Sequence, residues 1–311
     1  MSLIRDTVVT QGVFMKMHCS DSCRGAASGG AAAGMVSLTL RSCAASRRMS
    51  IDLLGSAMAV ISVAASIAFA ADQRIELVNK DVAGWVSTNE IAKPNTLSKS
   101  EAGEGWKMLW DGKTTEGWRS ATANDFPKHG WQIKAGELTV LAAGGKETVR
   151  GGDIITCEKY SDFVLKADFK ITPGANSGIK YFINPDANKG ASLEYQILDD
   201  ERHPDAKLGR DGNRTIGSLY DLIAADKDKK PAPIGEWNHA VIICSGTHVE
   251  HWMNGRKMLE YERGSADFRK LVAESKYKSW VNFGEAASGH ILLQDHGNQV
   301  SFRNIKIKIL K

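Results

Sequence analysis

The chain has 311 residues, of which 42% are hydrophobic and 24% are charged, so it is long enough for one large globular domain or two small ones. Its 40 Lys and Arg residues nearly balance 36 Asp and Glu residues, and they form no long basic run. Because nucleic acids and anionic membranes are bound through concentrated positive charge, this composition argues against both as partners.

The first 70 residues differ in composition from the rest of the chain. They hold six of the 40 basic and three of the 36 acidic residues, which leaves 34 basic and 33 acidic residues in the remainder. Residues 19–46 are rich in Gly, Ala and Ser and lack the spaced bulky residues that build a core. We therefore expect residues 1–48 to be disordered, or to be an extension upstream of a true start at Met49.

Residues 49–71 have the pattern of a secretory signal. Two arginines precede an apolar run that closes on Ala68-Phe69-Ala70, a typical cleavage site. A membrane anchor would need roughly 20 continuous apolar residues, which this run does not supply. The pattern predicts an exported protein, periplasmic or extracellular, with no membrane anchor.

Two of the five cysteines, Cys157 and Cys244, follow the predicted signal. Both lie in apolar patterns typical of strands. They are either two buried free thiols or a disulfide, since export permits a bridge but the sequence does not give the distance between them.

Residues 72–104 show little periodicity, and Pro94 and Asn95 lie among several Ser and Thr residues. This predicts an extended arm or linker. From residue 105 to 311 the apolar period is two almost throughout. Residues 131–141, for example, form a predicted hairpin that turns at Ala135-Gly136.

About ten such strands are separated by turn sequences, and only residues 266–277 have the pattern of a helix, which is short. A parallel α/β sheet would need long helices between its strands. The pattern therefore predicts an all-β fold, an antiparallel two-sheet sandwich with one short helix.

The strand at 193–198 is the first candidate for a functional surface. Alternation places Glu194 and Gln196 on the face opposite Leu193, Tyr195 and Ile197. A retaining glycosidase needs two carboxyl groups ~5 Å apart, and this strand does not show such a pair. Glu194 is either a catalytic carboxylate or an exposed residue on a solvated sheet face.

Histidines and tryptophans extend the set of candidates. Alternation places Gln294 and His296 on one face of a later strand, where the imidazole could transfer protons near neutral pH. His251 and Trp252 lie in the strand at 248–253, and we expect both to contact a substrate. An indole can stack on the C–H face of a sugar ring, although tryptophans also fill sandwich cores.

The acidic loop after residue 198 could hold a hard cation through carboxylate oxygens. Its spacing is not that of a calcium-binding loop, and several basic residues follow, so internal ion pairing is the alternative. No cofactor is evident from the sequence. If a divalent cation such as calcium takes part, Asp199 and His203 are its expected ligands.

Six segments, in order, resemble the 3-keto-disaccharide hydrolase family over residues 105–311. They are W-K-M-L-W-D-G-K-T-T-E-G-W (106–118), G-A-N-S-G-I-K-Y (174–181), L-E-Y-Q-I-L-D (193–199), G-E-W-N (235–238), W-M-N-G (252–255) and I-L-L-Q-D-H-G (291–297). The resemblance implies a concanavalin-like jelly roll that acts on glycosides already oxidised to a ketone at sugar carbon 3. It also implies an upstream sugar 3-dehydrogenase that supplies the ketone.

A ketone at C3 acidifies the proton on C2, so the aglycone can leave C1 by elimination and water can then add. This route needs a base, an acid and a group that stabilises an enolate, not a pair of carboxylates. We expect Glu194 and His296 to act as acid and base and Lys180 to stabilise the oxyanion. The expected contacts to sugar hydroxyls come from the amides Asn176, Gln196 and Gln294.

Two other functions fit the same fold. A carbohydrate-binding module would show stacking aromatics without titratable groups, and a conventional glycosidase would show a carboxylate pair.

The segment at 203–223 resembles one branch of the family in which this loop is longer. We expect it to shape the mouth of the pocket.

Overall fold

The computed structural model describes residues 82–85, 93–144, 151–188 and 191–310, and these contain all the elements below. The predicted disordered extension and signal sequence lie outside the described residues. No helix among the described residues is long and apolar enough to cross a membrane.

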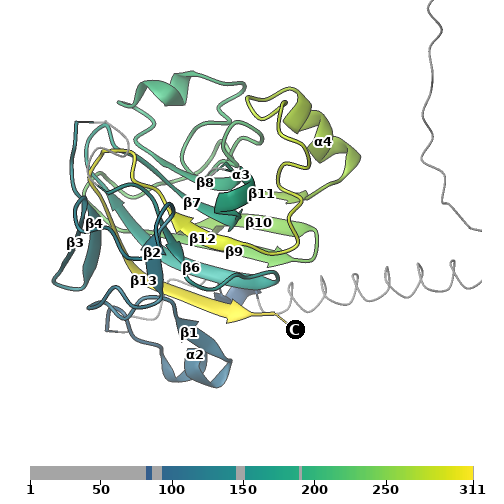
Figure 1. Cartoon of the computed structure of the whole chain (residues 1–311). Helices are drawn as coiled ribbons and strands as arrows, with labels where there is room; N and C mark the ends of the chain where they lie inside the picture. The colour runs from purple at the N-terminus through teal and green to yellow at the C-terminus, as the bar shows by residue number, and fades with distance from the viewer. Residues whose placement is uncertain (1–81, 86–92, 145–150, 189–190, 311) are drawn as a thin grey trace, which may run out of the picture. The chain divides into compact units, whose positions relative to one another are not determined.

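Two antiparallel sheets form the body of the fold, as predicted (Figure 1). The large sheet has the order β11-β10-β9-β6-β13-β4-β3, and β1 also pairs with β13. Its strands are β1 (Trp106–Met108), β3 (Trp131–Lys134), β4 (Glu137–Val140), β6 (Phe163–Ile171), β9 (Asn238–Ser245), β10 (His248–Met253), β11 (Arg256–Glu262) and β13 (Val300–Ile309).

The small sheet has the order β2-β5-β12-β7-β8. Its strands are β2 (Trp118–Ser120), β5 (Ile154–Thr156), β7 (Asn176–Ile183), β8 (Leu193–Leu198) and β12 (His290–Leu293). The helices are α2 (Lys99–Gly103), α3 (Pro185–Asn188) and α4 (Ala266–Ala273), together with the 3-10 turn η1 (Pro204–Lys207). The all-β jelly-roll sandwich is therefore confirmed, and α4 is the short helix predicted at 266–277.

Period-two alternation puts one face of each sheet into a shared core. In β6, Phe163, Leu165 and Phe169 lie in the main core, and in β8 the residues Tyr195 and Ile197 meet them from the other sheet. Burial of apolar side chains of this size contributes about 1.5–3 kcal/mol each to folding. The predicted hairpin at 131–141 is also present, with Ala135 and Gly136 at positive φ in the turn.

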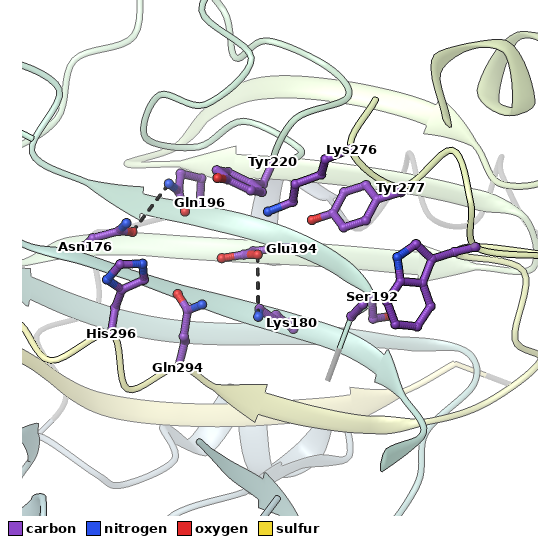
Figure 2. Close-up of a pocket in the computed structure, with 12 residues that line it drawn as sticks. Asn176, Lys180, Ser192, Glu194, Gln196, Tyr220, Lys276, Tyr277, Gln294 and His296 are labelled. Atoms are coloured by element: carbon purple, nitrogen blue, oxygen red, sulfur yellow. Dashed lines mark hydrogen bonds and ion pairs between the residues drawn. The ribbon is translucent and has the colours of Figure 1, made fainter. Parts of the chain in front are cut away.

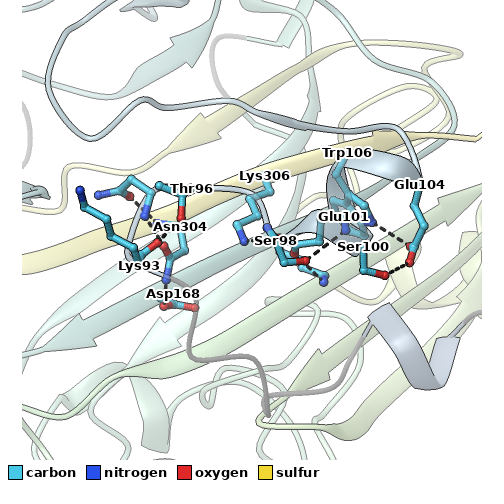
Figure 3. A network of polar contacts seen from close by, with 12 residues as sticks. Lys93, Thr96, Ser98, Ser100, Glu101, Glu104, Trp106, Asp168, Asn304 and Lys306 are labelled. Carbon is cyan, nitrogen blue, oxygen red and sulfur yellow. Dashed lines mark hydrogen bonds and ion pairs between the residues drawn. The ribbon is translucent and has the colours of Figure 1, made fainter.

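Residues 93–104, which we call the strap, lie on the outer face of the large sheet (Figure 3). The strap contains α2, whose capping box joins Ser98 and Glu101 through two hydrogen bonds of 3.0 and 3.1 Å. Asn95 and Asn304 exchange hydrogen bonds between backbone amide and side-chain oxygen. The sequence predicted an extended linker, whereas the described part of 72–104 is helical at 82–85 and in α2 and packs on the sheet.

Both cysteines of the described chain are free thiols. Cys244 is buried in the core, and burial raises the pKa of its thiol. Cys157 is exposed, which the sequence did not predict.

Candidate active site

The outer face of the small sheet carries a cavity of about 390 Å³ (Figure 2). This volume lies within the range of roughly 300–1,000 Å³ found for small-molecule sites. The cavity gathers six of the residues predicted from the sequence: Asn176, Lys180, Glu194, Gln196, Gln294 and His296. They come from β7, β8 and the segment that follows β12, three neighbouring parts of one sheet.

Lys180 and Glu194 form the centre of the cavity. They are register partners on β7 and β8, and Lys180 Nζ lies 3.8 Å from Glu194 Oε2. Their side chains are only 12% and 6% exposed. Coulombic attraction is strengthened at such burial, so the ammonium is placed to stabilise negative charge in the cavity.

Gly178 makes room for the Glu194 side chain. A Cβ atom on Gly178 would lie 2.3 Å from Glu194 Oε1 and 2.9 Å from its Cδ. Gly178 stands between Asn176 and Lys180 on the same face of β7, where any larger residue would displace the carboxylate. The sequence G-I-K in β7 is therefore part of the site's construction.

One end of the cavity holds amide side chains with unsatisfied atoms. Among the described residues, no hydrogen-bond donor reaches Gln196 Oε1 or Gln294 Oε1, although both atoms are buried. Gln196 Nε2 makes two long contacts of 3.5 Å, to Asn176 Oδ1 and Arg214 O. Because buried polar atoms are nearly always paired, these two oxygens indicate a ligand that donates hydrogen bonds.

His296 lies at the same end, as Figure 2 shows. Its ring is 6.0 Å from that of His203, and the two planes are nearly perpendicular at 88°. Burial and the charge of His296 lower the pKa of His203. The lowered pKa favours the neutral form of His203 beside His296.

Asp153, which precedes β5, was missed by the sequence analysis. Leu293 of β12 pairs with Ile154 of β5, so the next residues, Gln294 and Asp153, lie opposite each other just beyond the ends of the two strands. Asp295 N donates a hydrogen bond to Asp153 Oδ1 at 2.9 Å. Burial raises the pKa of Asp153 to about 6; Lys180 opposes this shift, and Glu194 adds to it. A second carboxyl group thus acts on the central pair without lining the cavity.

Two chain segments build walls over the small sheet (Figure 1, top of the view). The segment between β8 and β9 runs along β8, where Gly217 N donates to Gln196 O at 2.8 Å and Tyr220 N to Glu194 O at 3.0 Å. It contributes Tyr220 to the cavity, as expected for a segment that shapes the pocket mouth.

The segment after α4 forms the second wall and contributes Lys276, Tyr277 and Trp280. Lys276 N donates to Asp221 Oδ2 at 2.8 Å, which joins the two walls. Lys276 Nζ lies 4.0 Å above the ring of Tyr220. Desolvation lowers the pKa of Lys276, Lys180 adds to this shift, and Glu194 opposes it.

The two other residues predicted to contact the substrate, His251 and Trp252, do not line the cavity, so both predictions are wrong. His251 is fully buried in the core, where its Nε2 lies 2.8 Å from Tyr181 Oη, and burial lowers its pKa to about 3. Trp252 lies on the outer face of the large sheet, where its Nε1 donates to Glu250 Oε2 at 2.5 Å. Because β10 belongs to the large sheet, alternation sends His251 into the core and Trp252 to the outer face of that sheet.

The structure does not assemble Asp199 and His203 into a cation site. The Asp199 carboxylate already accepts hydrogen bonds from Gly174 N at 2.7 Å and from Arg202 Nη1 at 3.1 Å. His203 Nδ1 accepts from Asp205 N at 3.2 Å. Asp199 therefore stabilises the turn after β8, and His203 lies beside His296.

Comparison with known proteins identifies the family. The family model described as "3-keto-alpha-glucoside-1,2-lyase-like domain" matches residues 105–308. The chain belongs to this family. A 3-keto-disaccharide hydrolase from Bacteroides thetaiotaomicron is 34% identical over 262 residues, which cover 76% of this chain and 90% of that protein. The family resemblance in the sequence is confirmed.

Two solved structures are similar to this chain in sequence and in fold. A candidate glycosyl hydrolase from Parabacteroides distasonis is 32% identical, with a TM-score of 0.63, and the match covers 70% of this chain and 100% of that one. A second candidate glycosyl hydrolase from the same organism is 29% identical, with a TM-score of 0.50, covering 66% and 99%. The lyase-like domain of this chain thus has the sandwich of these relatives.

Proposed function

We propose that this protein cleaves glycosides that carry a ketone at C3 of the sugar, with net hydrolysis of the glycosidic bond. One observation carries the proposal beyond family membership. Of the described residues that line the cavity, Glu194 alone has a carboxyl group, and it is accompanied by the amino groups of Lys180 and Lys276 and by one imidazole. This set suits proton transfer at carbon, whereas a conventional retaining glycosidase needs two carboxyl groups ~5 Å apart.

The reaction begins with removal of the proton on C2. Its electron pair passes to the ketone and gives an enolate, C2=C3–O⁻. When the ketone re-forms, the pair moves to C1=C2, the bond from C1 to the aglycone oxygen breaks, and that oxygen takes a proton. Addition of water then places hydroxyl on C1 and a proton on C2, so the sum is hydrolysis.

The side chains of the cavity match these steps. Glu194 takes the C2 proton, and Lys180 stabilises the enolate oxygen, where charge develops in the transition state. His296 gives a proton to the departing oxygen. The amides Asn176, Gln196 and Gln294 hold sugar hydroxyls.

The test uses paired substrates: a native glycoside and the same glycoside oxidised at C3, each with and without chelator. We expect cleavage of the oxidised substrate alone. Cleavage of the native sugar alone would indicate a conventional glycosidase, and cleavage of neither would indicate a carbohydrate-binding module. Loss of activity with chelator would establish a metal requirement.

The proposal extends to location and supply. The signal pattern at residues 49–71 supports export to the periplasm or the extracellular space, and N-terminal sequencing of the exported protein tests it. A substrate with a ketone at C3 requires an earlier oxidation of that hydroxyl, so a sugar 3-dehydrogenase must act first.

A further inference from the structure

The two ends of the cavity differ in chemistry, and Glu194 lies between them (Figure 2). Asn176, Gln196 and His296 lie at one end, and Ser192 and Tyr277 lie at the other. We infer that the amide end binds the departing group and requires it to be a sugar, while the aromatic end binds the ketone-bearing ring. This assignment rests on the proposed function.

The position of His296 determines the orientation of the substrate along the cavity. In the proposed reaction its proton goes to the departing oxygen, so the departing group lies on the His296 side of Glu194. The ketone-bearing ring then extends toward Tyr277, with C2 beside Glu194.

The amide end provides buried acceptors that the hydroxyls of a departing sugar can satisfy. Gln196 Oε1 and Gln294 Oε1 are buried, and no donor among the described residues reaches them. Gln196 itself is 1% exposed, so its amide oxygen cannot turn to bulk solvent. Sites that hydrogen-bond a substrate hydroxyl discriminate strongly against analogues that lack it.

The aromatic end offers flat apolar surface. The hydroxyl of Ser192 already donates to Tyr181 O at 2.7 Å, and one face of Tyr277 is stacked on Phe283 at 4.0 Å. Trp280, one turn beyond Tyr277, has no aromatic or cationic partner among the described residues and is partly exposed. Its indole can therefore stack on a ligand.

Stacking of this kind favours the intermediate over the substrate. Elimination converts the puckered sugar ring into a ring flattened at C1, C2 and C3 by the conjugated C1=C2–C3=O system. A flat conjugated ring makes more contact with an indole than a puckered ring does. Binding that strengthens as the reaction proceeds accelerates it.

The experiment measures kcat/KM for two substrates, a 3-keto-disaccharide and methyl 3-keto-glucoside, whose departing group has no further hydroxyl. The wild type is expected to prefer the disaccharide. Gln294→Leu, and independently Gln196→Leu, should lower the ratio of the two values by about 10- to 100-fold. Trp280→Leu is the matched control: it should lower both values together and leave the ratio within about 3-fold, and Trp280→Phe should restore both.

An unchanged ratio in both amide variants, each folded by thermal melting, would overturn the assignment. A ratio that collapses in Trp280→Leu but not in the amide variants would reverse the direction of binding. If the wild type cleaves neither substrate, the proposed function itself fails, which is a different result from either of these.

Discussion

The two outer faces of the sandwich both bury polar groups but differ in how those groups are satisfied. On the large sheet, Glu101 of the strap pairs with Lys166 at 3.1 Å and with Lys306 at 2.6 Å. On the small sheet, the buried oxygens of Gln196 and Gln294 have no donor among the described residues. A fully paired buried network stabilises the fold, whereas an incompletely paired one indicates where a ligand binds.

The largest expected effect comes from the centre of the cavity. Glu194→Gln keeps the shape of the side chain but removes the proposed base, so kcat/KM for a 3-keto-glycoside should fall by about 100-fold or more. His296→Ala should have a similar effect through loss of the proposed acid. Steady-state kinetics give the result, and near-normal rates with either variant would remove that residue from the mechanism.

The strap should show the opposite behaviour. Glu101→Gln leaves the buried Lys306 and the partly buried Lys166 without their shared carboxylate, so the free energy of unfolding should fall by about 3 kcal/mol, while kcat/KM stays within about 2-fold. Denaturant unfolding and the same kinetic assay measure the two quantities. A stable variant would show that the ion pairs do not hold the strap.

Stability should depend on pH through this group in a defined direction. Burial raises the pKa of Glu101, but the hydrogen bonds from Lys306 and Ser98 and the charge of Lys166 outweigh it, so the net pKa is lowered. Its contribution is therefore present above the unfolded-state pKa of about 4.3 and is lost as the pH falls through the folded value. The Glu101→Gln variant should lack this part of the acid sensitivity.

Asp153 should give a pH dependence of stability with the opposite sign. Its folded pKa of about 6 exceeds the ordinary value of 3.8, so the native state binds more protons than the unfolded state between these two values. Stability should then fall as the pH rises through that window, by on the order of 3 kcal/mol in total. Asp153→Asn should flatten this part of the stability curve; an unchanged curve would place the transition in another group.

The smallest effect on stability is expected from the amides. Gln196→Leu removes a buried acceptor that no described residue satisfies, so the unfolding free energy should stay within about 1 kcal/mol of the wild type, or rise. A loss above about 2 kcal/mol would mean that the amide is a structural hydrogen-bonding group and not a ligand contact.

The sequence predicted the elements whose residues are close in the chain or follow a simple period. Alternation in β8 placed Glu194 and Gln196 on one face. Gln294 and His296 were expected on one face of a strand, whereas both reach the cavity from the irregular segment that follows β12. Antiparallel pairing then brings such faces side by side. β1, β2 and β5, of three residues each, were too brief to be predicted individually, and β11 has an irregular burial pattern.

The walls of the cavity could not be predicted in this way. Tyr220 and Trp280 lie in segments without regular period, which pack over the sheet through contacts distant in sequence. Trp252 was expected to contact the substrate, yet its strand β10 belongs to the large sheet, and the indole lies on that sheet's outer face. Local patterns show which face of a strand a residue occupies but not which sheet face carries the site.

The central claim is that the reaction passes through removal of the proton on C2 by the Glu194 and Lys180 cluster. Cleavage of a 3-keto-glycoside in D₂O, followed by early mass analysis of the released 3-keto-sugar, tests it directly, with product incubated alone as the control for spontaneous exchange. The account predicts one deuterium at C2 in each product molecule. Product that retains hydrogen at C2 would show that the bond breaks by direct displacement at C1 and would contradict the account.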